Sequence, residues 1–136
     1  MKQAVIIDSV RTAVGRMGGT LKDVEVDYIA AKALDEIVVR TGITKDVIDE
    51  VILGQAKQST DAPNLARLAL LRAGFPIEVP GYTVHRQCGS GIQSMNNGAQ
   101  QIMCGLSDIV IAGGAEGRRR IRQGKEFFQR SHSSTN

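Results

Sequence analysis

Aromatic side chains are scarce in this sequence, which has two tyrosines, three phenylalanines and no tryptophan. Aliphatic residues must therefore build the core, and an apolar content of 42% over 136 residues suits one domain of modest size. The only cysteines are Cys88 and Cys104, which excludes a disulfide framework. No apolar run could span a bilayer or resembles a signal peptide. We expect a cytoplasmic protein with reduced thiols and no membrane partner.

The positive net charge of +3 is unevenly distributed along the chain. Residues 117–136 hold six of the 17 basic residues and only one of the 14 acidic residues. The remainder is mildly acidic, so the charge gives no reason to expect that a folded body binds nucleic acid. The last 20 residues are rich in Arg, Ser and Gln without a sustained apolar period, which predicts disorder or a loose helix.

Short apolar runs alternate with helical patterns along residues 1–116. We predict four strands, at residues 4–7, 51–53, 82–84 and 109–112, and three helices, at residues 27–40, 63–73 and 89–103. Near-continuous apolar strands are typical of a parallel sheet covered on both faces. The pattern therefore predicts an α/β fold with a mostly parallel sheet and helices on both faces.

Two of the predicted helices have distinctive apolar patterns. Helix 63–73 is apolar almost all round, so it should be buried or contact a partner. Helix 89–103 carries a stripe of apolar residues at helical spacing, namely Ile92, Met95, Ala99, Ile102 and Met103.

Cys88 lies in the segment His85-Arg86-Gln87-Cys88-Gly89-Ser90-Gly91, between a predicted strand and a predicted helix. Ligand sites of open α/β sheets gather beyond the carboxyl ends of the strands. The helix N-terminus there favours a thiolate, and Gly89 and Gly91 allow a substrate to approach the backbone. Cys88 is thus a candidate thiol nucleophile for acyl transfer. The alternative from the residues alone is a small buried apolar side chain.

The other candidate groups near this segment receive structural interpretations. His85 is only three residues from Cys88, but residues i and i+3 leaving a strand need not face each other, so we interpret it as polar packing near the site. Cys104, at a helix end, is interpreted as a structural, buried cysteine.

Several stretches resemble the thiolase family of acyl-CoA acyltransferases in the right order. They cover residues 1–116 and comprise Arg11-Thr12-Ala13-Val14-Gly15-Arg16-Met17-Gly18-Gly19, Gly54-Gln55, Asn64-Leu65-Ala66-Arg67, Thr83 to Gly91 around Cys88, and Ala112-Gly113-Gly114-Ala115-Glu116. The overall pattern is similar to acetyl-CoA acetyltransferases.

This resemblance implies a reaction and a role for Cys88. The matching cysteine of the family attacks an acyl thioester, and its backbone N–H helps to form an oxyanion hole. A second acyl-CoA then gives a carbanion, and Claisen condensation yields a 3-ketoacyl-CoA, or the reverse thiolysis takes place. Coenzyme A thioesters would be substrates, with no tightly bound cofactor or metal.

The resemblance also implies that important parts lie outside this sequence. In the family, a Gly-His-Pro histidine, a second cysteine and a water-holding asparagine come from the carboxyl half, and most coenzyme A contacts come from a loop domain. We therefore expect residues 1–116 to be a truncated, incomplete N-terminal half, residues 117–136 to be a basic tail unlike the family, and the chain alone to be inactive.

Three alternatives concern partners and function. The family helix matching 89–103 packs against the other half, so its apolar face would be exposed here, which favours a homo-oligomer or a complementing C-terminal half as partner. The chain could also be a non-catalytic fragment. The third alternative is that the chain is a ketoacyl synthase-like condensing enzyme, although the cysteine segment and the Arg11–Gly19 loop favour a thiolase.

Overall fold

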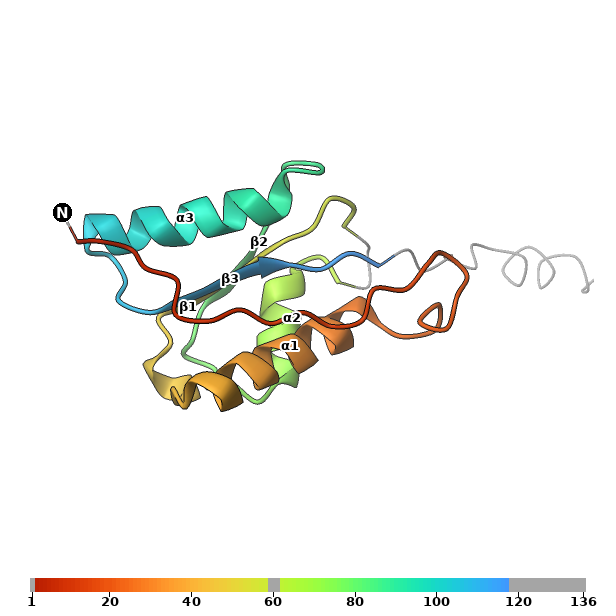
Figure 1. Cartoon of the computed structure of the whole chain (residues 1–136), viewed down its shortest axis with the longest axis horizontal. Coiled ribbons are helices and arrows are strands. Elements are labelled where there is room, and N and C mark those ends of the chain that lie inside the picture. Colours follow the sequence, from red (N-terminus) through yellow and green to blue (C-terminus); the bar gives the residue numbers. More distant parts are fainter. Residues whose placement is uncertain (1, 59–61, 118–136) are drawn as a thin grey trace, which may run out of the picture.

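The computed structural model describes residues 2–58 and 62–117. Its elements follow the order α1 (Val26–Thr41), a short 3-10 helix (Lys45–Val47), β1 (Glu50–Gly54), α2 (Leu65–Arg72), β2 (Gly81–Val84), α3 (Ser90–Cys104) and β3 (Val110–Gly114). The three strands form a parallel sheet in the order β2-β1-β3. Helices α1 and α2 cover one face and α3 covers the other (Figure 1). The predicted α/β fold class is confirmed.

The aliphatic core lies between the sheet and the pair α1 and α2. Val51 and Leu53 of β1 point into it, and α2 contributes Leu65, Ala66, Ala69 and Leu70, all fully buried. Smaller contributions come from α1, through Ala30, Ala31 and Leu34. The prediction that the helix around residues 63–73 is buried is therefore confirmed.

The ends of the helices follow the signals in the sequence. The side chain of Asn64 accepts a hydrogen bond from the backbone N–H of Arg67 at 3.2 Å, which caps α2. Gly42 and Gly105 follow α1 and α3 in the left-handed conformation, with φ of 69° and 76°. That conformation suits glycine and stops each helix at the expected place.

Helix α3 meets the sheet through small residues. Its buried positions are Ser90, Ser94 and Gly98, one turn apart. A Cβ atom on Gly98 would lie 3.1 Å from a methyl group of Val110 in β3, so this helix packs close to the strands. The apolar stripe lies elsewhere: Ile92 is 69% exposed and Met95 is 47% exposed. An exposed apolar face on this helix was expected and is observed.

The prediction of a strand at residues 4–7 is wrong. The segment has no strand pairing, and Val5, Ile6 and Ile7 are between 67% and 77% exposed. A short apolar run does not by itself specify a strand, because a strand also needs a pairing partner; here β1 pairs with β2 and β3, and the segment lies outside this sheet. Ion pairs hold it instead, from Lys2 to Asp108 and from Asp8 to Arg40.

Strand β3 extends further than predicted, through Gly113 and Gly114. The two glycines let it approach β1 and α3 closely: a Cβ on Gly114 would lie 2.9 Å from the carbonyl oxygen of Gly54. The three observed strands therefore end together at the carboxyl end of the sheet. The predicted tail at residues 117–136 lies, apart from Gly117, outside the described residues.

Candidate active site

Cys88 lies in the tight turn that joins β2 to α3. Strand β2 ends at Val84, and α3 begins at Ser90 after its cap residue Gly89. The thiol of Cys88 is exposed, so the alternative of a small buried apolar side chain is wrong. The predicted order of strand, cysteine and helix is confirmed, and it puts the thiol at the carboxyl end of the sheet.

Gln87, the residue before Cys88, has a φ of 49°, the only positive φ of a non-glycine residue in the described part of the chain. This left-handed conformation costs an L-residue about 1–2 kcal/mol. Such strain persists only where the surrounding structure enforces it. The turn around Cys88 is therefore held in place and is not a relaxed loop.

The hydroxyl of Ser90 makes two of the bonds that hold this turn. Its Oγ accepts the backbone N–H of Arg86 at 2.8 Å and donates to the carbonyl oxygen of Gln87 at 2.6 Å. The backbone N–H of Gly89 donates to the carbonyl of Arg86, which closes the same turn. Ser90 is buried, at 3% exposure. One buried hydroxyl thus connects the residues on both sides of Cys88.

Beside Cys88 lies an open depression of about 430 Å³, lined by Ala56, Lys57, Gln87, Cys88 and Glu116. Three loops that follow the three strands meet here. The carboxylate of Glu116 accepts the backbone N–H groups of Ala56 at 2.7 Å and Lys57 at 3.3 Å. Glu116 thereby ties the loop after β3 to the loop after β1, and one wall of the depression is fixed.

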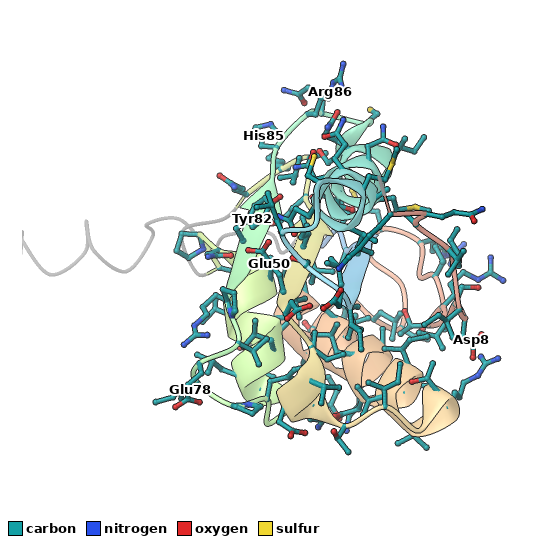
Figure 2. All side chains as sticks on the ribbon, turned by 90° about the vertical axis from the view of Figure 1, so that its left-hand side faces the viewer. Asp8, Glu50, Glu78, Tyr82, His85 and Arg86 are labelled. Atoms are coloured by element: carbon teal, nitrogen blue, oxygen red, sulfur yellow. The ribbon has the colours of Figure 1, made fainter. Side chains whose placement is uncertain are left out.

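His85 and Arg86 lie just outside the depression. Both are exposed, and Figure 2 shows them projecting outward from the loop after β2. His85 therefore lies near the site, as interpreted from the sequence, but its side chain is exposed and not packed. The guanidinium of Arg86 hydrogen-bonds Gln93 of α3, which in turn bonds Asn97, and Asn97 bonds the hydroxyl of Tyr82. This polar chain connects the loop to β2.

Gln55 is the least expected polar group near the site. It follows β1, is 1% exposed, and its side-chain amide has no hydrogen-bond partner among the described residues. Its backbone N–H donates to the carbonyl of Val84, which links the ends of β1 and β2. Buried amides normally have partners, so this one is an exception to that rule.

The structure separates the two cysteines. Cys104 is the last residue of α3, at the opposite end of the helix from Cys88, and it is exposed. The burial expected for Cys104 is therefore wrong, because the last turn of α3 extends beyond the sheet-facing stripe of Ser90, Ser94 and Gly98, whereas its structural role stays a prediction.

Sequence reasoning also missed functions for three residues. Gln87, Ser90 and Glu116 lie inside the motifs given above, but their residue types do not signal a left-handed φ or hydrogen bonds that hold a turn. Within the described ranges, no three His, Cys, Asp or Glu side chains gather as metal ligands would. None of the described helices is both long and apolar enough to cross a membrane.

Comparison with known proteins gives one consistent family. The sequence pattern of the family described as "Thiolase, N-terminal domain" matches residues 4–132. A steroid 3-ketoacyl-CoA thiolase of Mycobacterium tuberculosis is 44% identical over 122 residues, which are 89% of this chain and 30% of that protein. An acetyl-CoA acetyltransferase of Pseudomonas aeruginosa is 38% identical over 116 residues, 85% of this chain and 30% of that protein.

A solved structure agrees with these relatives. The crystal structure of the Bacillus anthracis acetyl-CoA acetyltransferase matches with a TM-score of 0.72 at 43% identity. The match covers 82% of this chain and 30% of that protein. This chain therefore spans about 30% of the length of the relatives that it matches.

Proposed function

The chain belongs to the thiolase family, and we propose that it carries the nucleophile of an acyl-CoA acyltransferase of the acetyl-CoA C-acetyltransferase type. Cys88 is the proposed nucleophile, and coenzyme A thioesters are the proposed substrates. The two relatives and the solved structure compared above are named for coenzyme A thioester chemistry, which supports this substrate class.

One observation carries the proposal: the exposed thiol of Cys88 lies on a strained, hydrogen-bonded turn beside an open depression. A nucleophile must be reachable and must be held in one geometry. The turn before α3 meets both needs, since the thiol is exposed while Ser90 fixes the backbone around it. A cysteine kept only for packing would need neither feature.

The proposed half-reaction balances as an acyl transfer. The thiolate sulfur of Cys88 attacks the carbonyl carbon of the acyl thioester, a new S–C bond forms, and the π electron pair moves to the oxygen. The backbone N–H of Cys88 is proposed as one donor to that oxyanion. Collapse breaks the bond to the sulfur of coenzyme A, which leaves as a thiolate and takes the proton that Cys88 has lost, through solvent. Cys88 remains acylated.

The second half-reaction needs a base, and none of the described residues that line the depression beside Cys88 is proposed for that role. Claisen condensation requires a base to remove a proton from the α-carbon of a second acyl-CoA. Cys104 lies at the far end of α3, and His85 is exposed and does not line the depression. We therefore propose that the 136-residue chain alone forms an acyl-enzyme slowly at most and completes no condensation or thiolysis. Partners that supply the rest, and a cytoplasmic location, stay predictions.

Acetyl transfer from acetyl-CoA to the chain, followed by intact mass and peptide mapping, tests the proposal. We expect one acetyl group on Cys88 and no turnover to acetoacetyl-CoA. The Cys104→Ser variant should keep the adduct and the Cys88→Ser variant should lose it; both thiols are exposed, so this pair is matched. An adduct on Cys104 alone, or multiple turnover by the purified chain, would contradict the proposal.

A complementing, non-catalytic role is the second candidate, and the exposed apolar face of α3 favours it. Ile92, Met95 and Met103 lie on this face and are between 39% and 69% exposed. Contiguous exposed apolar surface marks an interaction site more often than an ordinary surface. The same mass experiment separates the candidates, because a purely complementing half would give no acetyl adduct on Cys88 until its partner is added.

A further inference from the structure

We infer that Ser90 is the positioning residue that aims Cys88 and its backbone N–H at the acyl group. This inference rests on the proposed function, and it concerns a residue that does not touch the substrate.

The direction of the Cys88 peptide depends on the conformation of Gln87. The peptide unit that carries the Cys88 N–H also carries the Gln87 carbonyl, because both belong to the same planar amide. Rotation of Gln87 out of its φ of 49° would therefore turn the Cys88 N–H. Without a restraint, such a rotation would be favourable by about 1–2 kcal/mol, the usual cost of the left-handed conformation.

Ser90 supplies a restraint on that peptide unit. Its hydroxyl donates to the Gln87 carbonyl oxygen at 2.6 Å, on the same amide as the Cys88 N–H. It also accepts from the Arg86 N–H at 2.8 Å, so the hydroxyl is fixed from both sides. At 3% exposure, water competes little for these bonds. The backbone N–H of Ser90 donates to the same carbonyl oxygen at 3.1 Å, so loss of the hydroxyl would remove the shorter of two bonds to this peptide unit and the link to Arg86, and would weaken the restraint on Gln87.

The burial of Ser90 has an independent cause in the packing. A Cβ on Gly54 would lie 2.3 Å from the carbonyl carbon of Ser90, so the first turn of α3 rests directly on the end of β1. The hydroxyl is thus carried by the part of the helix that cannot move without disturbing the sheet. Cys88 is connected through Ser90 to the rigid centre of the molecule.

The helix also offers a matched control. Ser94 is one turn further along and fully buried, and its single hydroxyl proton is shared between the carbonyl oxygens of Gly91 at 2.7 Å and Gly113 at 2.6 Å. It makes no bond to the turn that holds Cys88. Ser94→Ala should therefore cost a comparable amount of stability as Ser90→Ala, while the geometry of the turn stays intact.

The test compares two reactions of one thiol in a Cys104→Ser background. With p-nitrophenyl acetate, the Cys88 sulfur attacks the carbonyl, an oxyanion forms, and p-nitrophenolate leaves. With iodoacetamide, the sulfur displaces iodide and no oxyanion forms. We expect Ser90→Ala to slow acylation about tenfold or more, as loss of an oxyanion donor does, with alkylation changed by about twofold or less. Ser94→Ala should change neither rate selectively.

Two results would overturn the inference. The first is an equal change in acylation and alkylation for Ser90→Ala, since that would be a general structural effect. The second is unchanged hydrogen exchange of the Arg86 amide in Ser90→Ala, because its N–H bonds the missing hydroxyl. Because p-nitrophenyl acetate needs no coenzyme A site, failure of acetyl-CoA labelling with selective loss of p-nitrophenyl acetate acylation would reject the proposed function and retain the positioning role.

Discussion

The two faces of the sheet pack against their helices through different kinds of residue. Against α1 and α2, the sheet packs through large aliphatic side chains such as Leu65 and Leu70, both 0% exposed. Against α3, it packs through Ser90, Ser94 and Gly98, with backbone in near contact at Gly54. Ile52 of β1 is also fully buried, outside the aliphatic cluster, so both interfaces remove apolar area from water. The difference is that the second one also brings the helix backbone into near contact with the strands.

This difference separates the residues that mainly stabilise the fold from those that mainly fix the position of α3. Aliphatic packing tolerates small shifts, because side chains can adjust when volume changes. A contact between backbones leaves no such freedom, so the start of α3 is positioned more closely than its few apolar contacts would suggest. The candidate nucleophile, Cys88, lies on the second kind of interface. The comparison predicts that substitutions on the two faces have separable effects on unfolding and on thiol chemistry.

The largest effect on stability is expected for Leu70→Ala, on the aliphatic face. Leu70 is fully buried in the core, and truncation should lower the free energy of unfolding by about 3 kcal/mol through lost transfer energy and a cavity. Urea unfolding measures this loss. The ratio of acylation to alkylation at Cys88 should stay unchanged below the unfolding transition, and a selective loss of acylation would mean that the two faces are coupled.

Gly54→Ala should have a smaller effect on stability and a larger effect on chemistry. The added methyl would lie 2.3 Å from the carbonyl carbon of Ser90, so α3 must shift, at a cost of about 2 kcal/mol. We expect a selective loss of Cys88 acylation, measured with p-nitrophenyl acetate against iodoacetamide. Gly113→Ala is the control, because a Cβ there meets only a methyl group of Leu53, at an ordinary contact distance of 3.7 Å. Equal acylation in both variants would refute the placement argument.

Much of the fold could be predicted from the sequence, because its signals are local. Asn64 begins α2, Gly42 and Gly105 stop α1 and α3, and apolar runs give β1, β2 and β3. The strand expected at residues 4–7 failed for a non-local reason. An apolar run forms a strand only if its backbone pairs with another strand; here β1 and β3 pair directly with each other, and the segment stays outside the sheet.

The site was less predictable than the fold. The position of Cys88 between a strand and a helix could be predicted, since both elements have periodic signals. The strain at Gln87 and the two hydrogen bonds of the Ser90 hydroxyl could not be predicted. They depend on the backbone φ and on the exact placement of the hydroxyl, whose two bonds differ in length by only 0.2 Å. Likewise, Glu116 bonds the Ala56 N–H 60 residues earlier in the sequence, a contact that no local pattern encodes.

The smallest effect is expected for Asp49→Asn, at the amino end of the sheet and away from Cys88. The carboxylate of Asp49 accepts the backbone N–H groups of Ile109 at 2.9 Å and Asp108 at 2.6 Å, which ties β1 to β3. These bonds, first that from Ile109, lower the pKa of Asp49 from its ordinary value of 3.8. The group is exposed, so we expect a loss of only about 1 kcal/mol at pH 7.

The sign of the pH dependence follows from the lowered pKa. The folded state prefers the ionised carboxylate, so the contribution of Asp49 is complete above pH 3.8 and is lost as the pH falls through the lower folded pKa. The stabilities of the wild type and Asp49→Asn should therefore converge below pH 3.8 in urea titrations. Asp46→Asn is the control: the Thr44 hydroxyl lowers the pKa of Asp46, but within one turn, so its effect should be smaller. A difference between wild type and Asp49→Asn that persists in acid would show that the substitution acts through packing and not through charge, and a change in Cys88 acylation would show that the sheet itself couples its two ends.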